Sequence, residues 1–244
     1  MEITYTEAEL APIQQNTVPH HVAIIMDGNR RWATKKNPLQ GHWAGAAIVL
    51  DIDRAASNLG IKILTLYGFS TENWSRSEIE VAALEEIIEV FLRENRERMI
   101  EEGVRLHIIG DLTPFPESLK KEVARSLDAT KECTIIELVV GLNYGGRDDI
   151  RRAFGKMVDA IGAGTLDKNN ISESTIATFL DTAPYGDPDL LIRTSGEMRV
   201  SNFLLWQLAY TEIYVTGLLW PDFTSQALYQ AVLSYQQRRR RIGS

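Results

Sequence analysis

Short apolar runs rich in β-branched residues recur along the chain and alternate with longer segments of helical periodicity. The apolar runs occupy residues 22–26, 62–67, 104–109, 135–141, 189–193 and 212–216. Helical spacing of apolar residues is found at 48–59, 78–102, 117–129, 147–162, 173–181 and 224–239. Strands that alternate with helices of this length predict right-handed crossovers and a mainly parallel sheet covered by helices on both faces.

The pattern predicts one folded unit after a short polar arm. Residues 1–18 show no sustained periodicity, and we expect them to form a flexible arm. Neither an internal repeat nor a long linker rich in Pro, Gly or Ser divides the rest of the chain. We therefore predict a single α/β domain over residues 19–244.

Composition narrows the class of protein. A chain of 244 residues with 44% hydrophobic and 24% charged residues is ordinary for a soluble globular protein. The net charge of −7 argues against general binding to nucleic acid, and the basic cluster Arg238–Arg241 is too small to reverse this. Cys133 is the sole cysteine, which excludes an internal disulfide and is typical of a reducing compartment.

The chain has no start that resembles a signal peptide and no apolar run long enough to cross a membrane. The nearest candidate, Phe203–Trp220, contains Gln207 and Glu212, and we expect it to lie in the core or at a subunit interface. These features predict a cytoplasmic protein.

Polar residues, with arginine and in most cases glycine, follow four of the predicted strands. The four segments are Asp27-Gly28-Asn29-Arg30-Arg31-Trp32, Phe69 to Arg76, Asn143-Tyr144-Gly145-Gly146-Arg147, and Arg193 to Asn202. In parallel sheets, ligands bind beyond the carboxyl ends of the strands. The sequence therefore predicts a binding site at this edge of the sheet.

The segment after the first strand suits an anion held with a metal ion. Gly28 permits close approach of the backbone, and Arg30 and Arg31 supply positive charge. A carboxylate such as Asp27 within a phosphate site is typical of Mg²⁺, which binds one or two carboxylates together with substrate phosphates. The alternative is an Asx-turn in which Asp27 bonds only to its own backbone.

A second anion site is predicted at Arg193, Arg199 and Ser201, because arginine offers a bidentate fork to phosphate oxygens and the hydroxyl adds a donor. The alternative is a salt-bridged surface. Two such sites indicate two phosphorylated substrates. A metal-dependent phosphotransferase with Asp27 as nucleophile is a rival hypothesis, although Asn29 stands where a second acid is expected. A catalytically silent subunit is another.

Several segments together resemble the cis-prenyltransferase family, of the undecaprenyl diphosphate synthase type. They are His21 to Trp32, Gly41-His42-x-x-Gly45, Ser70-x-Glu72-Asn73-Trp74-x-Arg76, Asn143 to Arg147, Arg193-Thr194-x-Gly196-Glu197-x-Arg199-x-Ser201-Asn202-Phe203, Leu219 to Phe223, and Arg241-Ile242-Gly243. The resemblance covers about residues 20 to 243.

The resemblance implies a homodimer with a six-stranded parallel sheet and a hydrophobic tunnel. It implies a Mg²⁺-dependent enzyme that condenses isopentenyl diphosphate with an allylic diphosphate, such as farnesyl diphosphate, into a Z-polyprenyl diphosphate of undecaprenyl type. A short- or medium-chain Z-prenyl product is the alternative. The lipid product also implies peripheral association with a membrane.

The resemblance further implies roles for individual residues. Asp27 positions Mg²⁺ with help from Glu212 across the dimer, and Asn73 is the matching candidate for proton acceptor. The allylic diphosphate is held by Gly28, Asn29, Arg30, Arg31 and His42, with Trp32 as a wall beside the prenyl chain. A mobile lid comprises Ser70, Thr71, Glu72, Asn73, Trp74, Arg76 and Glu80. Isopentenyl diphosphate binds Arg193, Arg199, Val200 and Ser201, with Arg241 from the partner subunit.

Three further points follow from the resemblance. Met198 stands where some family members have a metal-contacting histidine, so Glu212 acts without it. The segment 37–40 lacks an arginine often found near the allylic phosphates. The tunnel is expected between the sheet and the helix around 84–92, with Ile136 at its floor; plain core packing is the alternative for Ile136.

Overall fold

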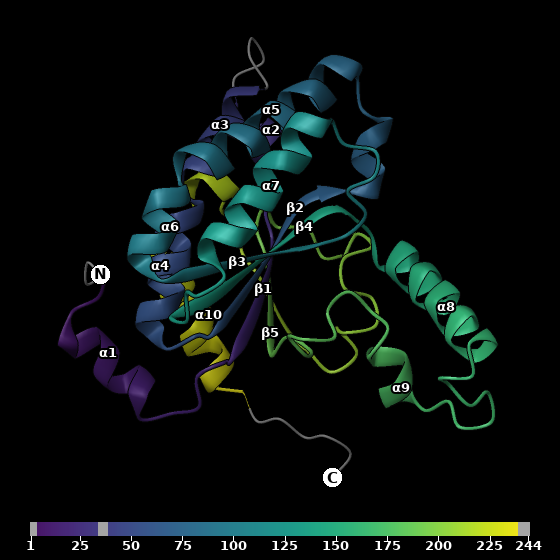
Figure 1. The fold of residues 1–244 in the computed structure, drawn as a ribbon. Helices are drawn as coiled ribbons and strands as arrows, with labels where there is room; N and C mark the ends of the chain where they lie inside the picture. Colours follow the sequence, from purple (N-terminus) through teal and green to yellow (C-terminus); the bar gives the residue numbers. More distant parts are fainter. Residues whose placement is uncertain (1–3, 34–38, 239–244) are drawn as a thin grey trace.

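The computed structural model describes residues 4–33 and 39–238, and its centre is a six-stranded sheet (Figure 1). The strands are β1 (His21–Ile25), β2 (Ile63–Ser70), β3 (Val104–Ile109), β4 (Ile136–Tyr144), β5 (Leu190–Arg193) and β6 (Glu212–Val215). They lie in the order β3-β4-β2-β1-β5-β6, and every neighbouring pair is parallel. The predicted six-stranded parallel sheet is confirmed.

Ten α-helices and two short 3₁₀ segments connect these strands within the described residues. The helices are α1 (Glu7–Gln14), α2 (Asn29–Trp32), α3 (Leu39–Ala47), α4 (Val49–Leu59), α5 (Glu78–Glu94), α6 (Arg96–Glu102), α7 (Glu117–Thr130), α8 (Gly146–Gly162), α9 (Glu173–Ala177) and α10 (Ser225–Gln236). The 3₁₀ segments are η1 (Thr71–Ser75) and η2 (Trp220–Asp222).

The single helix predicted over 78–102 is wrong in one respect, because the structure divides it at Asn95. The Asn95 side chain donates a hydrogen bond to the carbonyl of Phe91 at 3.0 Å. Asn95 itself has φ of −102° and ψ of 4°, outside the usual helical values, and α6 begins at the next residue. Periodicity alone does not report this break, since apolar spacing continues on both sides.

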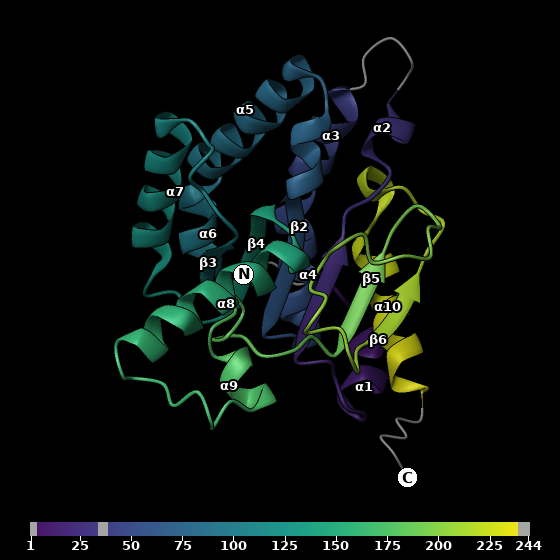
Figure 2. The ribbon, with the colours of Figure 1, turned by 90° about the vertical axis from the view of Figure 1, so that its right-hand side faces the viewer.

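The two faces of the sheet are covered unequally. In Figure 1, helices α3 to α7 lie on one side of the sheet, whereas α8 and α9 lie on the other. The larger core cluster includes residues of α4, α5, α7 and α10, such as Leu50, Leu84, Val123 and Leu228. The smaller cluster includes Ile25, Val139 and Phe203. Figure 2, seen from the side, shows α8 in front of the sheet and β6 at its outer edge.

The N-terminal segment, for which the sequence predicts a flexible arm, contacts the domain in the structure. It forms α1, which starts with a capping box between Thr6 and Glu9. Ile13 is fully buried, and the Tyr5 hydroxyl donates to the carbonyl of Ser225 at 2.8 Å. The sequence pattern does not predict these contacts, because only single residues of this segment are buried and they produce no apolar periodicity.

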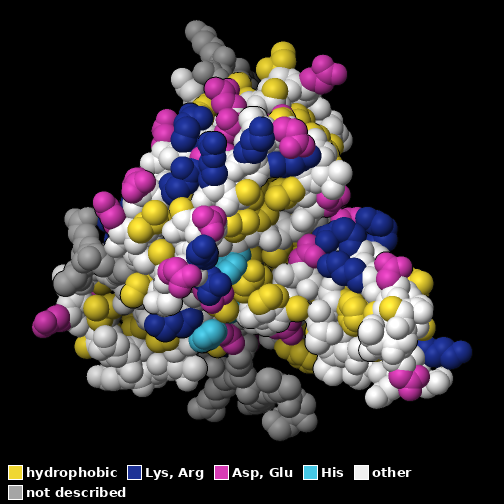
Figure 3. Space-filling model, viewed as in Figure 1, with side chains coloured by type: hydrophobic (Ala, Val, Ile, Leu, Met, Phe, Trp, Pro, Cys, Tyr) yellow, Lys and Arg dark blue, Asp and Glu magenta, His cyan; other side chains and the backbone are white. Residues whose placement is uncertain are grey.

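Charges of both signs alternate over the surface of α4 to α7 (Figure 3). Arg98 pairs with Asp51 at 2.6 Å, and Arg54 pairs with Glu102 at 2.5 Å. Arg96 pairs with Glu122, which is largely buried. Much of the basic charge on this face is therefore neutralised by neighbouring acids.

Candidate active site

The carboxyl ends of β1, β2 and β5 open into a cavity of about 770 Å³. Most of the residues predicted for the site line it, namely Asp27, Gly28, Asn29, Arg30, Arg31, His42, Ser70, Glu72, Asn73, Arg76, Arg193, Arg199 and Ser201. They come together because parallel strands end at one edge of the sheet. The strand β1 lies between β2 and β5, so its end faces both neighbouring loops.

Asp27 lies where the loop after β1 meets the loop after β5. The buried Thr194 hydroxyl accepts the backbone N–H of Asp27 at 2.8 Å and donates to the Asp27 carbonyl at 2.6 Å. The Asp27 carboxylate accepts hydrogen bonds from Arg193 at 2.9 Å and from Arg31 at 3.2 Å. Asp27 is therefore fixed through both backbone and side chain, and its Asx-turn alternative does not describe these contacts.

The charge state of Asp27 follows from these partners. Burial alone would raise the pKa of the Asp27 carboxyl. Hydrogen bonds from Arg193 and Ser195, together with the charges of Arg193 and Arg31, outweigh burial and hold this pKa below its ordinary value. Asp27 is thus a carboxylate at neutral pH and borders the cavity.

The glycines of the first segment and of α3 are required by close packing. Gly28 has φ of 108°, and a Cβ there would lie 2.8 Å from Leu219 Cδ2. A Cβ at Gly41 would collide with the Asn29 carbonyl, and one at Gly45 would lie 2.7 Å from Asn29 Oδ1. These glycines let α3 approach the loop after β1, which brings His42 to the cavity.

Three basic side chains, those of Arg76, His42 and Arg30, lie around one acid, Glu80, near the start of α5. Glu80 Oε1 lies 2.8 Å from Arg76 Nη1, 3.4 Å from His42 Nε2 and 3.8 Å from Arg30 Nε. Burial and the positive charge of Arg76 lower the pKa of His42, so this imidazole is neutral at pH 7. An anion that enters the cavity meets Arg30 and Arg76 with a single carboxylate between them.

Arg193 forms the wall between the two predicted anion sites. Its residue is only 4% exposed, and its guanidinium donates to Asp27, to the Ser201 hydroxyl at 2.8 Å and to the Arg199 carbonyl. Arg199 is exposed and pairs with Glu197 at 2.6 Å. The buried arginine therefore organises the loop, whereas Arg199 presents its charge to solvent and to the cavity.

The loop after β5 holds several residues in the left-handed region of backbone conformation. Ser195, Ser201, Asn202 and Leu204 have φ of 76°, 48°, 63° and 44°. For residues other than glycine this conformation costs on the order of 1–3 kcal/mol each, and it persists where surrounding contacts enforce it. The contacts of Arg193 with Arg199 and Ser201 are among those that do so.

The segment after β2 lies across the cavity as η1. Asn73 Oδ1 accepts the backbone N–H of Ser70 at 3.1 Å, and Glu72 accepts a hydrogen bond from Asn202 at 2.7 Å. Trp74 donates to Asn143 at 2.8 Å and packs against Phe69. The segment predicted as a lid is therefore folded down onto the rest of the site.

Some predicted site residues lie outside the cavity lining. Trp32 is 40% exposed, and its indole N–H donates to Asp222 at 2.7 Å, outside the residues that line the cavity. Val200 packs against the smaller core cluster, Thr71 lies beside Gly145, and Trp74 is turned toward Phe115. Arg241 falls outside the described residues.

Glu212 lies far from Asp27 within one chain. Its register partner on β5 is Leu190, at the amino end of the strand, and its carboxylate pairs with Arg238 at 2.7 Å. Asp27 follows the carboxyl end of β1, at the opposite edge of the sheet. In the described part of the chain, no group of three or more His, Cys, Asp or Glu residues could hold a metal ion.

Several residues that line the cavity had no individual role predicted from the sequence, although Asn202 belongs to a segment predicted for the site. Met26, Tyr67, Gly68, Leu84 and Asn202 also border the cavity. Gly68 offered a signal, because an isolated glycine within a strand often marks a close approach. A Cβ at Gly68 would lie 3.0 Å from Val140 Cγ1. The others look like ordinary strand, helix or loop residues until the tertiary structure places them.

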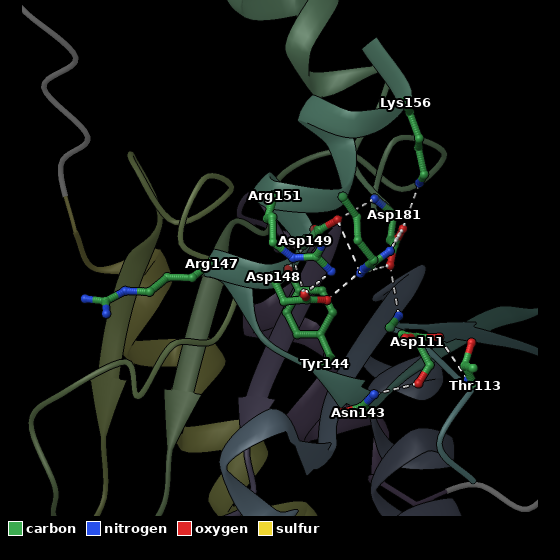
Figure 4. A network of polar contacts seen from close by, with 12 residues as sticks. Asp111, Thr113, Asn143, Tyr144, Arg147, Asp148, Asp149, Arg151, Lys156 and Asp181 are labelled. Carbon is green, nitrogen blue, oxygen red and sulfur yellow. Dashed lines mark hydrogen bonds and ion pairs between the residues drawn. The ribbon is translucent and has the colours of Figure 1, made fainter. Parts of the chain in front are cut away.

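A polar network fixes the turn between β4 and α8 (Figure 4). Asp149 is buried and accepts hydrogen bonds from the Tyr144 hydroxyl and the Asp181 backbone, both at 3.0 Å. Burial raises the pKa of Asp149. Arg152 makes a bidentate ion pair with Asp181, with distances of 2.8 and 2.6 Å. The hydrogen bond from Tyr144 thereby ties the turn 143–147 to this network.

A second cavity, of about 100 Å³, continues from the first toward the core. Its lining is almost entirely apolar and includes Leu84, Ile87, Ile88, Phe91 and Leu92 of α5, Ile108 of β3, and Val140 and Leu142 of β4. Met26, Asn29, His42, Gly68 and Leu84 border both cavities. Its position between the sheet and the helix at 84–92 agrees with the predicted tunnel.

Ile136 does not border this apolar cavity, and it is 2% exposed in the larger core cluster. It shares a face of β4 with Leu138 and Val140, since side chains alternate along a strand. Ile136 therefore lies deeper than Val140 along the same path away from the polar cavity.

The geometry defines a class of site: arginines gathered around the carboxylates of Asp27 and Glu80, in a cavity that adjoins an apolar one. Such a site fits ligands that combine an anionic head with a hydrocarbon chain. Comparisons with known proteins agree. The family model Prenyltransf, for undecaprenyl diphosphate synthases, matches residues 25–243. The chain belongs to this prenyltransferase family.

Individual relatives support the same family. An isoprenyl transferase of Chlamydia trachomatis is 47% identical over 94% of this chain and 93% of the relative, and one of Clostridium perfringens is 42% identical over 97% and 94%. A lavandulyl diphosphate synthase structure from Lavandula x intermedia, in complex with dimethylallyl diphosphate, has a TM-score of 0.90 and 37% identity over 93% of this chain and 99% of that chain. A probable undecaprenyl diphosphate synthase structure from Campylobacter jejuni has a TM-score of 0.78 and 29% identity over 94% and 100%.

The protein is thus a prenyl-transferring enzyme with the cis-prenyltransferase fold. The rival hypothesis of a phosphotransferase has no support from these relatives. Among residues 4–33 and 39–238, no helix has the length and apolar character to cross a membrane.

Proposed function

We propose that the protein condenses isopentenyl diphosphate with an allylic diphosphate, in the presence of Mg²⁺, and produces a Z-polyprenyl diphosphate. One observation carries the proposal: two arginine-bearing loops meet at Asp27 in a polar cavity, and this cavity adjoins an apolar one. This arrangement accommodates two diphosphate groups and one hydrocarbon chain.

The allylic diphosphate is assigned to the loop after β1. Arg30, Arg31 and His42 line the polar cavity, and His42 also borders the apolar extension. Backbone amides of Gly28 and Asn29 lie in the same turn, and glycine permits close approach of phosphate oxygens. The prenyl chain then extends along α5 and the face of β4.

Isopentenyl diphosphate is assigned to the loop after β5. Arg199 and the Ser201 hydroxyl offer donors to phosphate oxygens, and Arg193 fixes both of them. The reaction breaks the bond between C1 of the allylic substrate and its diphosphate oxygen. A bond forms from this C1 to C4 of isopentenyl diphosphate, and C2 of isopentenyl diphosphate loses a proton.

Arginines stabilise the diphosphate as negative charge develops on it during bond cleavage. The residues present also fit Mg²⁺. Asp27 is a charged carboxylate that lines the cavity, and the arginines proposed to bind phosphate lie beside it. Asp27 would hold the ion together with diphosphate oxygens. When bound, Mg²⁺ supplies further neutralisation of the leaving group.

Asn73 orients the reacting groups rather than serving as the base. An amide is a poor proton acceptor, and Asn73 Oδ1 already accepts the Ser70 N–H. We assign the C2 proton to a diphosphate oxygen, which is basic and lies in the same cavity by this proposal.

A homodimer is part of the proposal. The outer face of α8 exposes an apolar stripe of Ile150, Phe154 and Val158, at 36%, 68% and 50% exposure. Exposed apolar stripes of this kind support subunit contact. Glu212 cannot reach the Asp27 of its own chain, so its proposed contribution to Mg²⁺ requires a partner subunit, as does that of Arg241.

An undecaprenyl-type product, and with it peripheral association with a membrane, is the proposed outcome. The small volume of the apolar cavity, about 100 Å³, favours a shorter Z-prenyl product as the second candidate. Incubation with radiolabelled isopentenyl diphosphate, several allylic starters and Mg²⁺, followed by sizing of the products, separates the two. Absence of any prenyl product under these conditions would overturn the proposal.

A further inference from the structure

The turn between β4 and α8, residues 143–147, touches both loops that the proposed function requires. Gly145 is enclosed by Thr71 of η1 and by Asn202 of the loop after β5; a Cβ there would lie 2.6 Å from Thr71 Oγ1 and 2.7 Å from Asn202 Nδ2. No role for this turn follows from the binding of either substrate. Its position indicates a mechanical role.

Asn202 makes the central contacts of this arrangement. Its amide nitrogen donates to Glu72 Oε1 at 2.7 Å, and its amide oxygen accepts the backbone N–H of Arg147 at 3.0 Å. Its backbone carbonyl accepts the N–H of Gly146 at 2.6 Å. One residue therefore joins η1, the turn 143–147 and the loop after β5.

Asparagine suits this position for two reasons. Its φ of 63° lies in the left-handed region, which asparagine enters more readily than most residues. Its side chain carries a donor and an acceptor, and each is used by a different element. Burial would raise the pKa of Glu72, but the Asn202 hydrogen bond and its other partners lower it, so the acceptor is charged.

A second contact between η1 and the turn supports the same interpretation. Trp74 Nε1 donates to Asn143 Oδ1 at 2.8 Å, and Asn143 donates to the Asp111 carbonyl at 2.7 Å. Figure 4 shows Asn143 and Tyr144 at the base of the network that includes Asp149 and Asp181. The segment η1 therefore contacts the turn through both Trp74 and Thr71.

We infer that Asn202 is a positioning residue that couples η1, which carries Asn73 and Trp74, to the loop that carries Arg199 and Ser201. Through this contact, order at the second anion site is transmitted to the segment over the reacting carbons. The contact itself is independent of the proposed function, although its catalytic meaning rests on that function.

The test exchanges donor and acceptor across the contact. Asn202→Asp keeps the acceptor for Arg147 but places a carboxylate against Glu72. Glu72→Gln in the same chain restores a donor–acceptor pair with reversed polarity. Amide hydrogen exchange over residues 70–76 is measured on the full-length protein without substrate, alongside kcat and the KM for isopentenyl diphosphate.

In Asn202→Asp, we expect exchange over 70–76 to accelerate roughly 10- to 100-fold and the KM to rise by a similar factor, as for a lost charge-assisted hydrogen bond. The double variant should return amide exchange over residues 70–76 to within about threefold of the parent. Asn170→Asp, which adds the same charge at an exposed loop residue, is the matched control and should change neither.

Two results would overturn the inference: unchanged exchange in Asn202→Asp, or a double variant no better than the single one. If circular dichroism shows that Asn202→Asp is unfolded, Glu72→Ala removes the same bond from the other side and should accelerate the same exchange. Because exchange needs no turnover, a failure of the proposed function leaves this readout intact.

Discussion

The polar and apolar cavities adjoin each other, yet they are built in opposite ways. The polar cavity takes its charged groups from loops that follow strands, in short contiguous segments such as Asp27–Arg31. The apolar cavity takes its walls from single residues spread over helices and strands, such as Phe91 and Val140. The first depends on chemical identity and the second on shape, so substitutions in the two should differ in kind.

The largest effect is expected at Asp27. Asp27→Ala removes the proposed metal ligand and should lower Mg²⁺-dependent product formation at least about 1,000-fold, since each ~1.4 kcal/mol of lost transition-state stabilisation is tenfold in rate. Turnover of the purified variant is the measurement. Asp27→Asn is the matched variant, because it keeps the shape and a hydrogen-bonding oxygen for the buried Arg193. A folded Asp27→Ala protein with near-parental activity contradicts the mechanism.

The next effect separates the two arginines of the second anion site. Arg199 is exposed, so Arg199→Ala should raise the KM for isopentenyl diphosphate roughly 10- to 100-fold, as expected for a charge-assisted bond of about 1.5–3 kcal/mol, and leave the fold unchanged. Arg193 is buried against Asp27, so Arg193→Ala should also affect the allylic site and thermal stability. Steady-state kinetics with each substrate varied in turn decides this. The assignment fails if Arg199→Ala alters only the KM of the allylic starter.

The apolar cavity should respond in product length rather than in rate. Ile136 lies on the face of β4 that continues from Val140, and Ile136→Ala should shift products to longer chains, at a cost of about 2–5 kcal/mol in stability. Val139 points to the opposite face and packs in the smaller core cluster, so Val139→Ala is the control. Sizing of labelled products is the readout. An unchanged product ladder from folded Ile136→Ala returns this residue to plain core packing.

The smallest effect concerns pH and the border between the two cavities. His42 is buried, and its pKa lies below the ordinary 6.5, so it is neutral at pH 7 and gains a proton as pH falls. A protonated His42 would attract the allylic diphosphate, so affinity should rise a few-fold from pH 7 toward pH 5, relative to His42→Gln. The dissociation constant of the allylic starter is measured by titration into the parent and into His42→Gln at each pH. Protonation of the ligand affects both proteins equally, so the difference between them reports His42. Parallel pH profiles for the two proteins would exclude His42 from the allylic site.

Much of the fold was predictable because hydrophobic periodicity reports burial directly. All six apolar runs form strands, and residues 147–162 form α8. The apolar pattern of such a segment follows directly from how many of its faces are buried against the core. The break at Asn95 was not predictable, because it involves a single residue within a continuous apolar pattern. The contacts of the α1 segment were not predictable, because they involve residues distant in the sequence. The contact of Trp32 with Asp222 was not predictable either, because the two residues are 190 positions apart in the sequence.

The sequence by itself determined the chemistry of the polar edge. The loop after β1 carries a carboxylate, a glycine and arginines, and the loop after β5 carries arginines and a serine. These residue types predict anion binding where the ends of parallel strands lie together. Only the tertiary structure decided which of these groups touch. It buried Arg193 between Asp27 and Ser201, joined Asn202 to Glu72, and opened an apolar cavity beneath His42. The physical reason is that local sequence fixes side-chain type and element, whereas distances between elements depend on packing of the whole core.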